Sequence, residues 1–128
     1  MHELDSSFTL IAPRHLRIKR IYDAPARSDG FRLLVDRLWP RGITKKRAML
    51  SDWMPELAPS AELRKWFGHD PGRWSEFRRR YYAELAGKQS LIKSIRNRLL
   101  DERVTLLYAA RDATRNQAQV LKQFIEAA

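Results

Sequence analysis

One segment near the carboxyl end of the chain restricts the possible folds more than any other, the run VTLLYAA over Val104–Ala110. A short and nearly continuous apolar run of this kind is typical of a strand that is buried on both faces, as strands of helix-covered parallel sheets are. Phe31–Leu38 has the same character in its centre, and Leu16–Tyr22 is a third predicted strand, in which apolar and basic residues alternate imperfectly. Met49–Met54 is a candidate fourth strand. These segments predict a sheet of three to four strands.

Helix signals occupy the stretches between and after these strands. Three of the predicted helices begin at a residue that can cap the first amide groups, and two end at a glycine. The predicted helices run from Ser60 to Gly68, from Asp70 to Gly87, from about Gln89 and from near Thr114. Asp112 or Thr114 is expected to cap the last helix. The pattern predicts an α/β fold, with a small and mostly parallel sheet of three to four strands flanked by about four to five helices.

The length and composition indicate one domain. A chain of 128 residues with 44% apolar residues is long enough for a compact domain with a core and too apolar for a disordered chain. We expect a flexible leader over residues 1–14 and a single α/β domain over residues 15–128. The absence of cysteine excludes a disulfide, a thiol nucleophile and a zinc–thiolate site.

The sequence also indicates where the protein resides and what it does not bind. No run approaches the roughly 18–20 apolar residues of a membrane span, and the start of the chain lacks the features of a secretory signal. We therefore expect a soluble, cytoplasmic protein of bacterial type that does not contact a membrane. There is no Gly-rich phosphate loop and no histidine pair with metal-ligand spacing, so the sequence predicts neither a cofactor nor a metal.

The formal net charge of +10 is unevenly distributed along the chain. The stretch Pro71–Leu100 holds 8 basic residues against 2 acidic ones, and the rest of the chain is closer to balance. A field of this sign attracts small anionic ligands, nucleic acids and acidic proteins alike. We expect a small anionic ligand, and the alternatives are a nucleic-acid-binding module that uses the basic helical surface Arg73–Arg98 and a role in protein interaction.

The segment that follows the second predicted strand combines residues that suit an anion site. Ligands of open α/β sheets lie at the carboxyl ends of strands. Arg37 and Arg41 can make forked hydrogen bonds to a phosphate or carboxylate. Trp39 offers a flat face to a ligand, and Gly42 allows the backbone to come close. The structural alternative is that Asp36 pairs with one arginine while Trp39 packs as a lid on the core.

The loop between the last predicted strand and the last predicted helix is a second candidate. The first amide groups of a helix form a natural anion site, to which Arg111 and Arg115 would add positive charge. Tyr108 is expected to stack on a ligand or close the pocket, and Asn116 to orient it. The alternative is a capped helix start with solvated arginines.

Together the two segments predict a pocket at the carboxyl edge of the sheet. Asp36 or Asp112 is the candidate acid or base, and whether any reaction is catalysed stays open. One wall consists of Asp36, Arg37, Trp39, Arg41 and Gly42, and the opposite wall of Tyr108, Asp112 and Asn116.

His69 is a third candidate, because a histidine beside a carboxylate can act as a general base. Its neighbour Asp70 is already expected to cap a helix, and adjacent residues rarely have the geometry of a base and its orienting carboxylate. His69 is therefore either a ligand contact, a general base or a structural residue.

Several segments together resemble a known family. The stretches VDRLWPRGI (Val35–Ile43), LRKWFGHDP (Leu63–Pro71), WSEFRRRYYAEL (Trp74–Leu85) and VTLLYAARDATRNQA (Val104–Ala118) resemble the YeaO-like branch of a bacterial family of unknown function. The resemblance covers about residues 15–125. It implies a single α/β domain in the bacterial cytoplasm and supplies no established activity.

The resemblance also bears on catalysis. More distant relatives carry a cluster of cysteine, histidine and arginine after the final strand, whereas the matching loop here, Arg111–Asn116, has neither cysteine nor histidine. This difference implies that thiol chemistry is out of reach and that the chain uses other groups or only binds. Related proteins are sometimes described as winged-helix regulators, but no segment of this sequence has the pattern of a helix-turn-helix.

Overall fold

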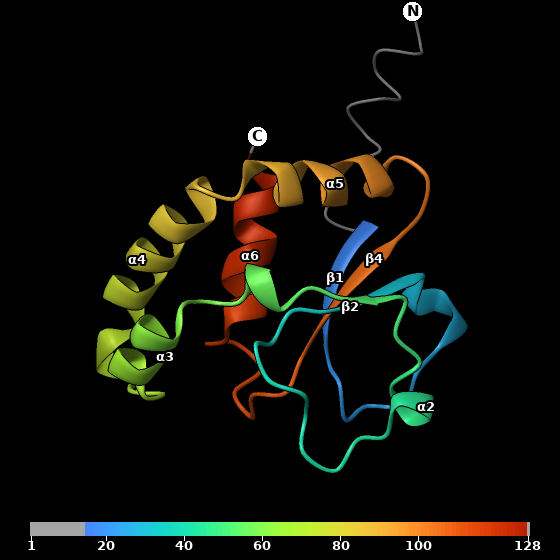
Figure 1. The fold of residues 1–128 in the computed structure, drawn as a ribbon, viewed down its shortest axis with the longest axis horizontal. Coiled ribbons are helices and arrows are strands. Elements are labelled where there is room, and N and C mark those ends of the chain that lie inside the picture. Colours follow the sequence, from blue (N-terminus) through green and yellow to red (C-terminus); the bar gives the residue numbers. More distant parts are fainter. Residues whose placement is uncertain (1–14, 128) are drawn as a thin grey trace, which may run out of the picture.

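A four-stranded parallel sheet forms the centre of the computed structural model, which describes residues 15–127 (Figure 1). The strand order is β1-β4-β2-β3, and every neighbouring pair is parallel. The predicted α/β fold is therefore confirmed, including the fourth strand. The strands are β1 (Leu16–Arg20), β2 (Phe31–Leu34), β3 (Asp52–Trp53) and β4 (Val104–Tyr108).

Within residues 15–127 five helices accompany the sheet, and α3 begins and ends at the capping residues that the sequence indicates. Ser60 begins α3 by accepting a hydrogen bond from the amide of Leu63, and Gly68 ends it in the left-handed region, with φ 52°. Asp70 caps a short 3-10 turn that leads into α4. The helices are α2 (Lys45–Ala48), α3 (Ala61–Phe67), α4 (Trp74–Ala86), α5 (Gln89–Leu99) and α6 (Gln117–Glu126).

The two faces of the sheet are covered differently. On one face, α3 to α6 pack over Leu33 and Leu106 and enclose the main apolar core, in which Tyr81 is fully buried (Figure 1). On the other face lie Leu34 and Leu107, in a smaller cluster with residues of the β1–β2 and β2–β3 connections and of α2. This alternation along β2 and β4 is what a strand pleat imposes on a sheet that is covered on both sides.

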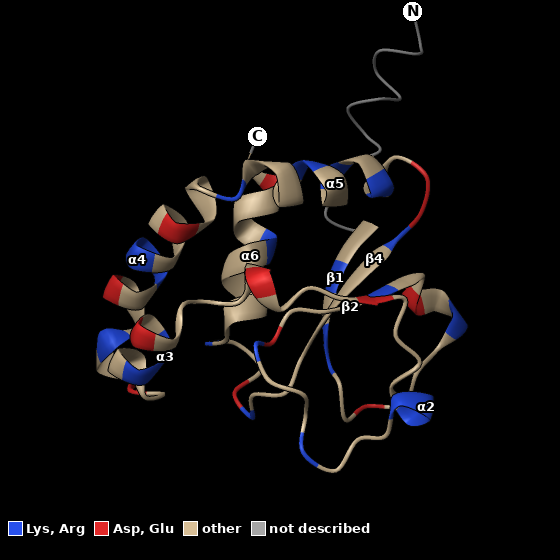
Figure 2. Ribbon diagram, viewed as in Figure 1, with Lys and Arg blue, Asp and Glu red and all other residues tan. Residues whose placement is uncertain are grey.

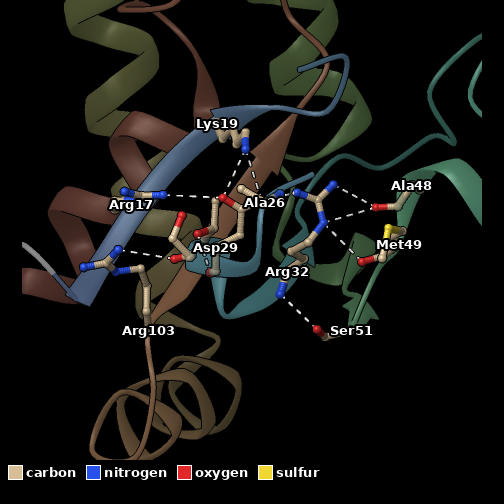
Figure 3. A network of polar contacts seen from close by, with 11 residues as sticks. Arg17, Lys19, Ala26, Asp29, Arg32, Ala48, Met49, Ser51 and Arg103 are labelled. Atoms are coloured by element: carbon tan, nitrogen blue, oxygen red, sulfur yellow. Dashed lines mark hydrogen bonds and ion pairs between the residues drawn. The ribbon is translucent and has the colours of Figure 1, made fainter. Parts of the chain in front are cut away.

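Part of the second face is covered by a polar network instead of apolar side chains (Figure 3). Asp29, just before β2, has a fully buried side chain and accepts hydrogen bonds from Lys19 at 3.1 Å and from Arg32 at 2.6 Å. The Arg32 guanidinium also donates to the carbonyl oxygens of Ala48 and Met49. Burial would raise the pKa of Asp29, but these donors and the Ala26 amide hold that pKa below its ordinary value.

Several predicted element boundaries need correction. The first strand ends at Arg20 instead of Tyr22, the last ends at Tyr108 instead of Ala110, and β3 covers only Asp52–Trp53 of the predicted Met49–Met54. The strand predicted over Phe31–Leu38 ends at Leu34, because the chain then leaves the sheet and the carbonyl of Asp36 accepts a hydrogen bond from the Trp53 indole. The last helix begins at Gln117, and its cap is Asn116, whose side chain accepts from the amide of Gln119. The prediction that Asp112 or Thr114 caps this helix is wrong.

The predicted leader over residues 1–14 lies outside the described residues. Within residues 15–127, none of the helices combines the length and the apolar character that a membrane crossing requires.

Candidate functional site

A cleft opens at the carboxyl ends of β2 and β4, where the loops after these two strands face α3 and the start of α6. Its volume is about 340 Å³, and a second hollow of about 460 Å³ adjoins it. The two share the lining residues Phe67, His69, Ala109, Ala110 and Arg115, so the hollows adjoin, and the pair is called the trough. The trough lies where open parallel sheets bind their ligands.

Asp36 supplies the carboxyl group of the first hollow. One of its oxygens accepts a hydrogen bond from the Ala109 amide at 2.9 Å, and the other accepts from the side-chain amide of Gln117. Burial raises the pKa of Asp36 to about 6, although these two donors and the positive charge of Arg64 act in the opposite direction. The Asp36 carboxyl group therefore titrates only slightly below neutral pH.

Arg37 connects two walls of the cleft. Its Nε and Nη2 atoms donate to the carbonyl oxygen of Pro59 at 3.3 and 3.0 Å. Among the described residues, its Nη1 atom makes no hydrogen bond, so one edge of the guanidinium stays available. Arg37 thus holds the wall in place and still presents positive charge to the cleft.

The wall that Arg37 contacts is held by side chains of α4 and by the residue that precedes α5. Tyr81 donates to the carbonyl of Leu57 at 2.5 Å, and Glu84 accepts from the Ser60 amide at 2.8 Å. Lys88 donates to the carbonyls of Glu56 and Ala58. Consecutive backbone groups of this segment therefore have side-chain partners, which pre-forms the wall before any ligand arrives.

The loop after β4 is fixed in a similar way. Arg20, at the end of β1, donates to the carbonyl oxygens of Ala110 at 3.0 Å and Ala109 at 3.3 Å. The Ala109 amide is meanwhile bound to Asp36. Both walls of the cleft are thus positioned by hydrogen bonds to the backbone.

The charges around the trough are predominantly positive. Five arginines line it against two aspartates, and the arginines come from three different segments. Within residues 15–127, no carboxylate lies within 4.0 Å of the guanidinium groups of Arg41, Arg64 and Arg111. The lining arginines are Arg37, Arg41, Arg64, Arg111 and Arg115, and the aspartates are Asp36 and Asp112.

Comparison with known proteins identifies the family. Residues 15–128 match the family described as the inactive DUF488-N3 subclade. The chain belongs to this family. It is 42% identical over 111 residues to the uncharacterized protein YeaO of Escherichia coli, which covers 87% of this chain and 96% of YeaO. The predicted YeaO-like membership is therefore confirmed.

Mycobacterial proteins are also similar to this member of the DUF488-N3 subclade. The uncharacterized proteins Mb3100c of Mycobacterium bovis and Rv3073c of Mycobacterium tuberculosis are each 37% identical over 118 residues, which cover 91% of this chain and 98% of theirs. No solved structure matches the chain. The relatives thus extend over nearly the whole chain without naming a ligand.

The structure places most of the predicted site residues of this DUF488-N3 protein around the trough. Asp36, Arg37, Trp39, Arg41 and Asn116 line the first hollow, Asp112 lines the second, and His69 lines both. Two predicted residues lie elsewhere. Tyr108 is buried in the core beneath the helices, and Gly42 is exposed outside both hollows.

Asn116 lines the cleft, but its side chain already has partners. Its oxygen accepts from the Gln119 amide at 2.9 Å, and its nitrogen donates to the carbonyl of Asp112 at 2.9 Å. The amide group is buried and holds the start of α6 to the loop. These contacts favour a structural role over the predicted orientation of a ligand.

The two candidate acid–base residues differ in environment. One oxygen of Asp112 accepts hydrogen bonds from the amides of Arg115 and Thr114 and from the Thr114 hydroxyl, which lower the pKa of Asp112. Asp112 therefore stays ionised and organises its loop. Of the two, Asp36 is the one whose proton exchanges near neutral pH.

His69 is exposed and has a positive φ of 58°. The carboxylate of its neighbour Asp70 accepts from the Gly72 amide, as a cap does, so it does not orient the imidazole. The structure thus gives no support to a His–Asp base and leaves His69 as a possible ligand contact. Among the described residues, no three histidine or carboxylate side chains come together as a metal would require.

Trp39 and Tyr22 form an aromatic lip on one side of the cleft. The Trp39 indole donates to the carbonyl of Ile43 at 2.6 Å and meets Trp53 edge to face, with ring centroids 5.5 Å apart. The Tyr22 hydroxyl donates to the carbonyl of Arg41 at 2.8 Å. Both residues of the lip are therefore held by the backbone of the loop after β2.

Sequence reasoning assigned no role in this cleft to Tyr22, Arg64 or Gln117. Arg64 lies in the middle of α3, in the candidate segment of His69, but its spacing does not place it beside Asp36. Gln117 is 81 residues from Asp36, with which it forms a hydrogen bond. Only the way the helices pack brings them to the cleft, and no local pattern contains that information.

Basic residues lie along α4 and α5, on the helical surface Arg73–Arg98 (Figure 2). Most of them have partners within the molecule. Arg79 and Arg80 both pair with Glu76, and Arg98 pairs with Glu102. Arg96 donates to the carbonyl oxygens of Phe124, Ile125 and Ala127 at the end of α6. These partners reduce the charge that the surface can offer to a nucleic acid, so they weigh against the second hypothesis.

Proposed function

We propose that this protein binds a small anionic molecule, bearing phosphate or carboxylate, in the cleft at the carboxyl edge of its sheet. One observation carries the proposal: guanidinium groups that have no carboxylate partner among residues 15–127 surround a largely pre-formed cleft. Unpaired arginines are costly to gather unless their charge is used, and their forked donors match phosphate and carboxylate. The contrast with the paired arginines of α4 supports the cleft as the site.

The family description supports binding without turnover. The family is described as inactive, and the loop Arg111–Asn116 offers neither cysteine nor histidine. In this proposal Asp36 adjusts the charge of the cleft and does not act as a catalytic acid or base. The bacterial relatives and the absence of cysteine also support a cytoplasmic location.

Thermal unfolding with a panel of anions at low and high salt tests this function. A ligand at ~100 times its dissociation constant adds roughly 2.7 kcal/mol of stability, which gives a clear rise in Tm. We expect one class of small anion to stabilise the protein and to keep part of its effect at high salt. Stabilisation by oligonucleotides alone, lost at high salt, would instead favour the basic helical surface.

Two matched variants locate the binding. Arg64→Gln removes a cleft guanidinium that has no hydrogen-bond partner among residues 15–127, and Arg79→Gln removes one on the basic helical surface. We expect Arg64→Gln to abolish most of the ligand-induced rise in Tm and Arg79→Gln to leave it unchanged. Equal responses from the two variants would contradict binding in the cleft.

A further inference from the structure

We infer that the ligand is an elongated dianion, with one anionic group at each end of an apolar body. This inference rests on the proposed function and specifies the chemistry of the same site. It comes from the order of charged and apolar groups along the trough.

The trough has cationic groups at both ends. The first hollow alone contains Arg37, Arg41 and Arg64, and the second hollow alone contains Arg111 and Asp112. The Asp112 carboxylate is bound to the amides of Thr114 and Arg115 and lies 3.9 Å from the Arg115 guanidinium, which leaves Arg111 without a carboxylate partner among the described residues. These arginines come from the loop after β2, from α3 and from the loop after β4. An anionic group at either end would therefore meet an arginine that the other end does not use.

The part common to both hollows is mostly apolar. Three of its five lining residues are apolar, Phe67, Ala109 and Ala110, and the other two are His69 and Arg115. The volumes of about 340 and 460 Å³ are in the range of sites for molecules much larger than a phosphate or acetate ion. A single small anion would fill one end and leave the apolar middle to water, whereas a longer molecule would bury it.

The charge balance also points to more than one negative charge. The trough has five arginines against two aspartates, and Asp36 is largely ionised only above its raised pKa. A ligand with one negative charge would leave much of this excess uncompensated. A dianion compensates it at two separate places, which gives the site selectivity by length as well as by charge.

Calorimetric titration of the full chain with paired probes tests the inference. The probes are alkane-α,ω-bisphosphonates and dicarboxylates of increasing chain length, each beside the matching monoanion with a methyl end. We expect one family of dianions to bind roughly tenfold or more tightly than its monoanions, because a second charge-assisted contact contributes at least that factor. Affinity should pass through an optimum in chain length. The two families distinguish phosphate-like from carboxylate ends.

Arg111→Gln and Arg64→Gln separate the two ends, because neither guanidinium has a carboxylate partner within residues 15–127 whose loss would disturb the fold. Arg111→Gln should remove the advantage of the dianion and leave the monoanion unaffected. Arg64→Gln should weaken both probes, and Arg79→Gln neither. Equal affinity for dianions and monoanions, with no effect of Arg111→Gln, would overturn the inference and leave the proposed function intact. Absence of binding by every probe would overturn both.

Discussion

Asp29 and Asp36 lie at opposite ends of β2, and the fold treats their charges in opposite ways. Asp29, at the amino end, has a fully buried side chain that contacts Lys19, Arg17 and Arg32, and its pKa is lowered. Asp36, at the carboxyl end, is bound by two neutral amide donors, and its pKa is raised. A carboxylate neutralised by fixed cations stabilises a fold, whereas one whose charge is not neutralised costs stability.

The arginines show the same difference. At the amino end, Arg32 directs its guanidinium to Asp29 and to two backbone carbonyls, so its hydrogen-bonding capacity is used within the protein (Figure 3). At the carboxyl end, Arg41, Arg64 and Arg111 have no carboxylate partner among the described residues. The charges at the amino end are paired within the protein, and we propose that an anion neutralises the unpaired arginines at the carboxyl end.

The largest effect is expected at the amino end. Asp29→Ala leaves Arg32 buried without its carboxylate and should lower the free energy of unfolding by about 3–5 kcal/mol. Urea denaturation measures the loss. Because the pKa of Asp29 is lowered in the folded state, the difference from the wild type should shrink as the pH falls below the ordinary value of 3.8. A loss of stability smaller than that from removing an exposed ion pair would contradict the stabilising role of the Asp29 network.

Asp36→Asn is expected to raise the free energy of unfolding, whereas Asp29→Ala lowers it. The pKa of Asp36 is about 6 in the folded chain against an ordinary 3.8, so the folded state holds more protons in this interval, and stability falls as the pH rises through it. The variant lacks this titration and should be more stable than the wild type at pH 7, by about 1–3 kcal/mol. Denaturation at several pH values should show the difference growing between pH 4 and 6 and constant above. A variant less stable than the wild type at pH 7 would contradict the assignment.

A smaller effect is expected at Asn116. This prediction separates a structural residue at the carboxyl edge from the residues that are proposed to bind the ligand. Asn116→Ala removes the cap of α6 and should lower the free energy of unfolding by about 1 kcal/mol. Asn116→Ser keeps a neutral acceptor for the Gln119 amide and should recover part of the loss. Anion-induced stabilisation should persist in both variants. Its disappearance in Asn116→Ser, with the cap retained, would show that Asn116 contacts the ligand.

The sequence was sufficient for the sheet and most helices, because buried strands and helix caps are encoded locally. Ser60 and Gly68 bound α3 as their residue types predict. Local signals failed at the last helix, where Asp112, Thr114 and Asn116 are all good caps and only the geometry of the loop selects Asn116.

The candidate site could be predicted only in part. The two loops were identifiable because they follow apolar strands and are rich in arginine, and both line the trough. Arg64 and Gln117 were not identifiable, because their positions depend on how α3 and α6 pack on the sheet. Tyr108 does not line the trough, because the alternation of side chains along β4 turns the Tyr108 side chain into the core. Its predicted role in the pocket is therefore not supported.

The most direct test of the contrast between the two aspartates is an NMR titration of their side-chain carboxyl carbons, with and without the tightest-binding dianion. We predict that Asp36 titrates near pH 6 in the free protein and that the bound anion raises its pKa further, while Asp29 stays below its ordinary value in both states. An Asp36 that titrates near 3.8 and does not respond to the anion would contradict a ligand-binding cleft built around this residue.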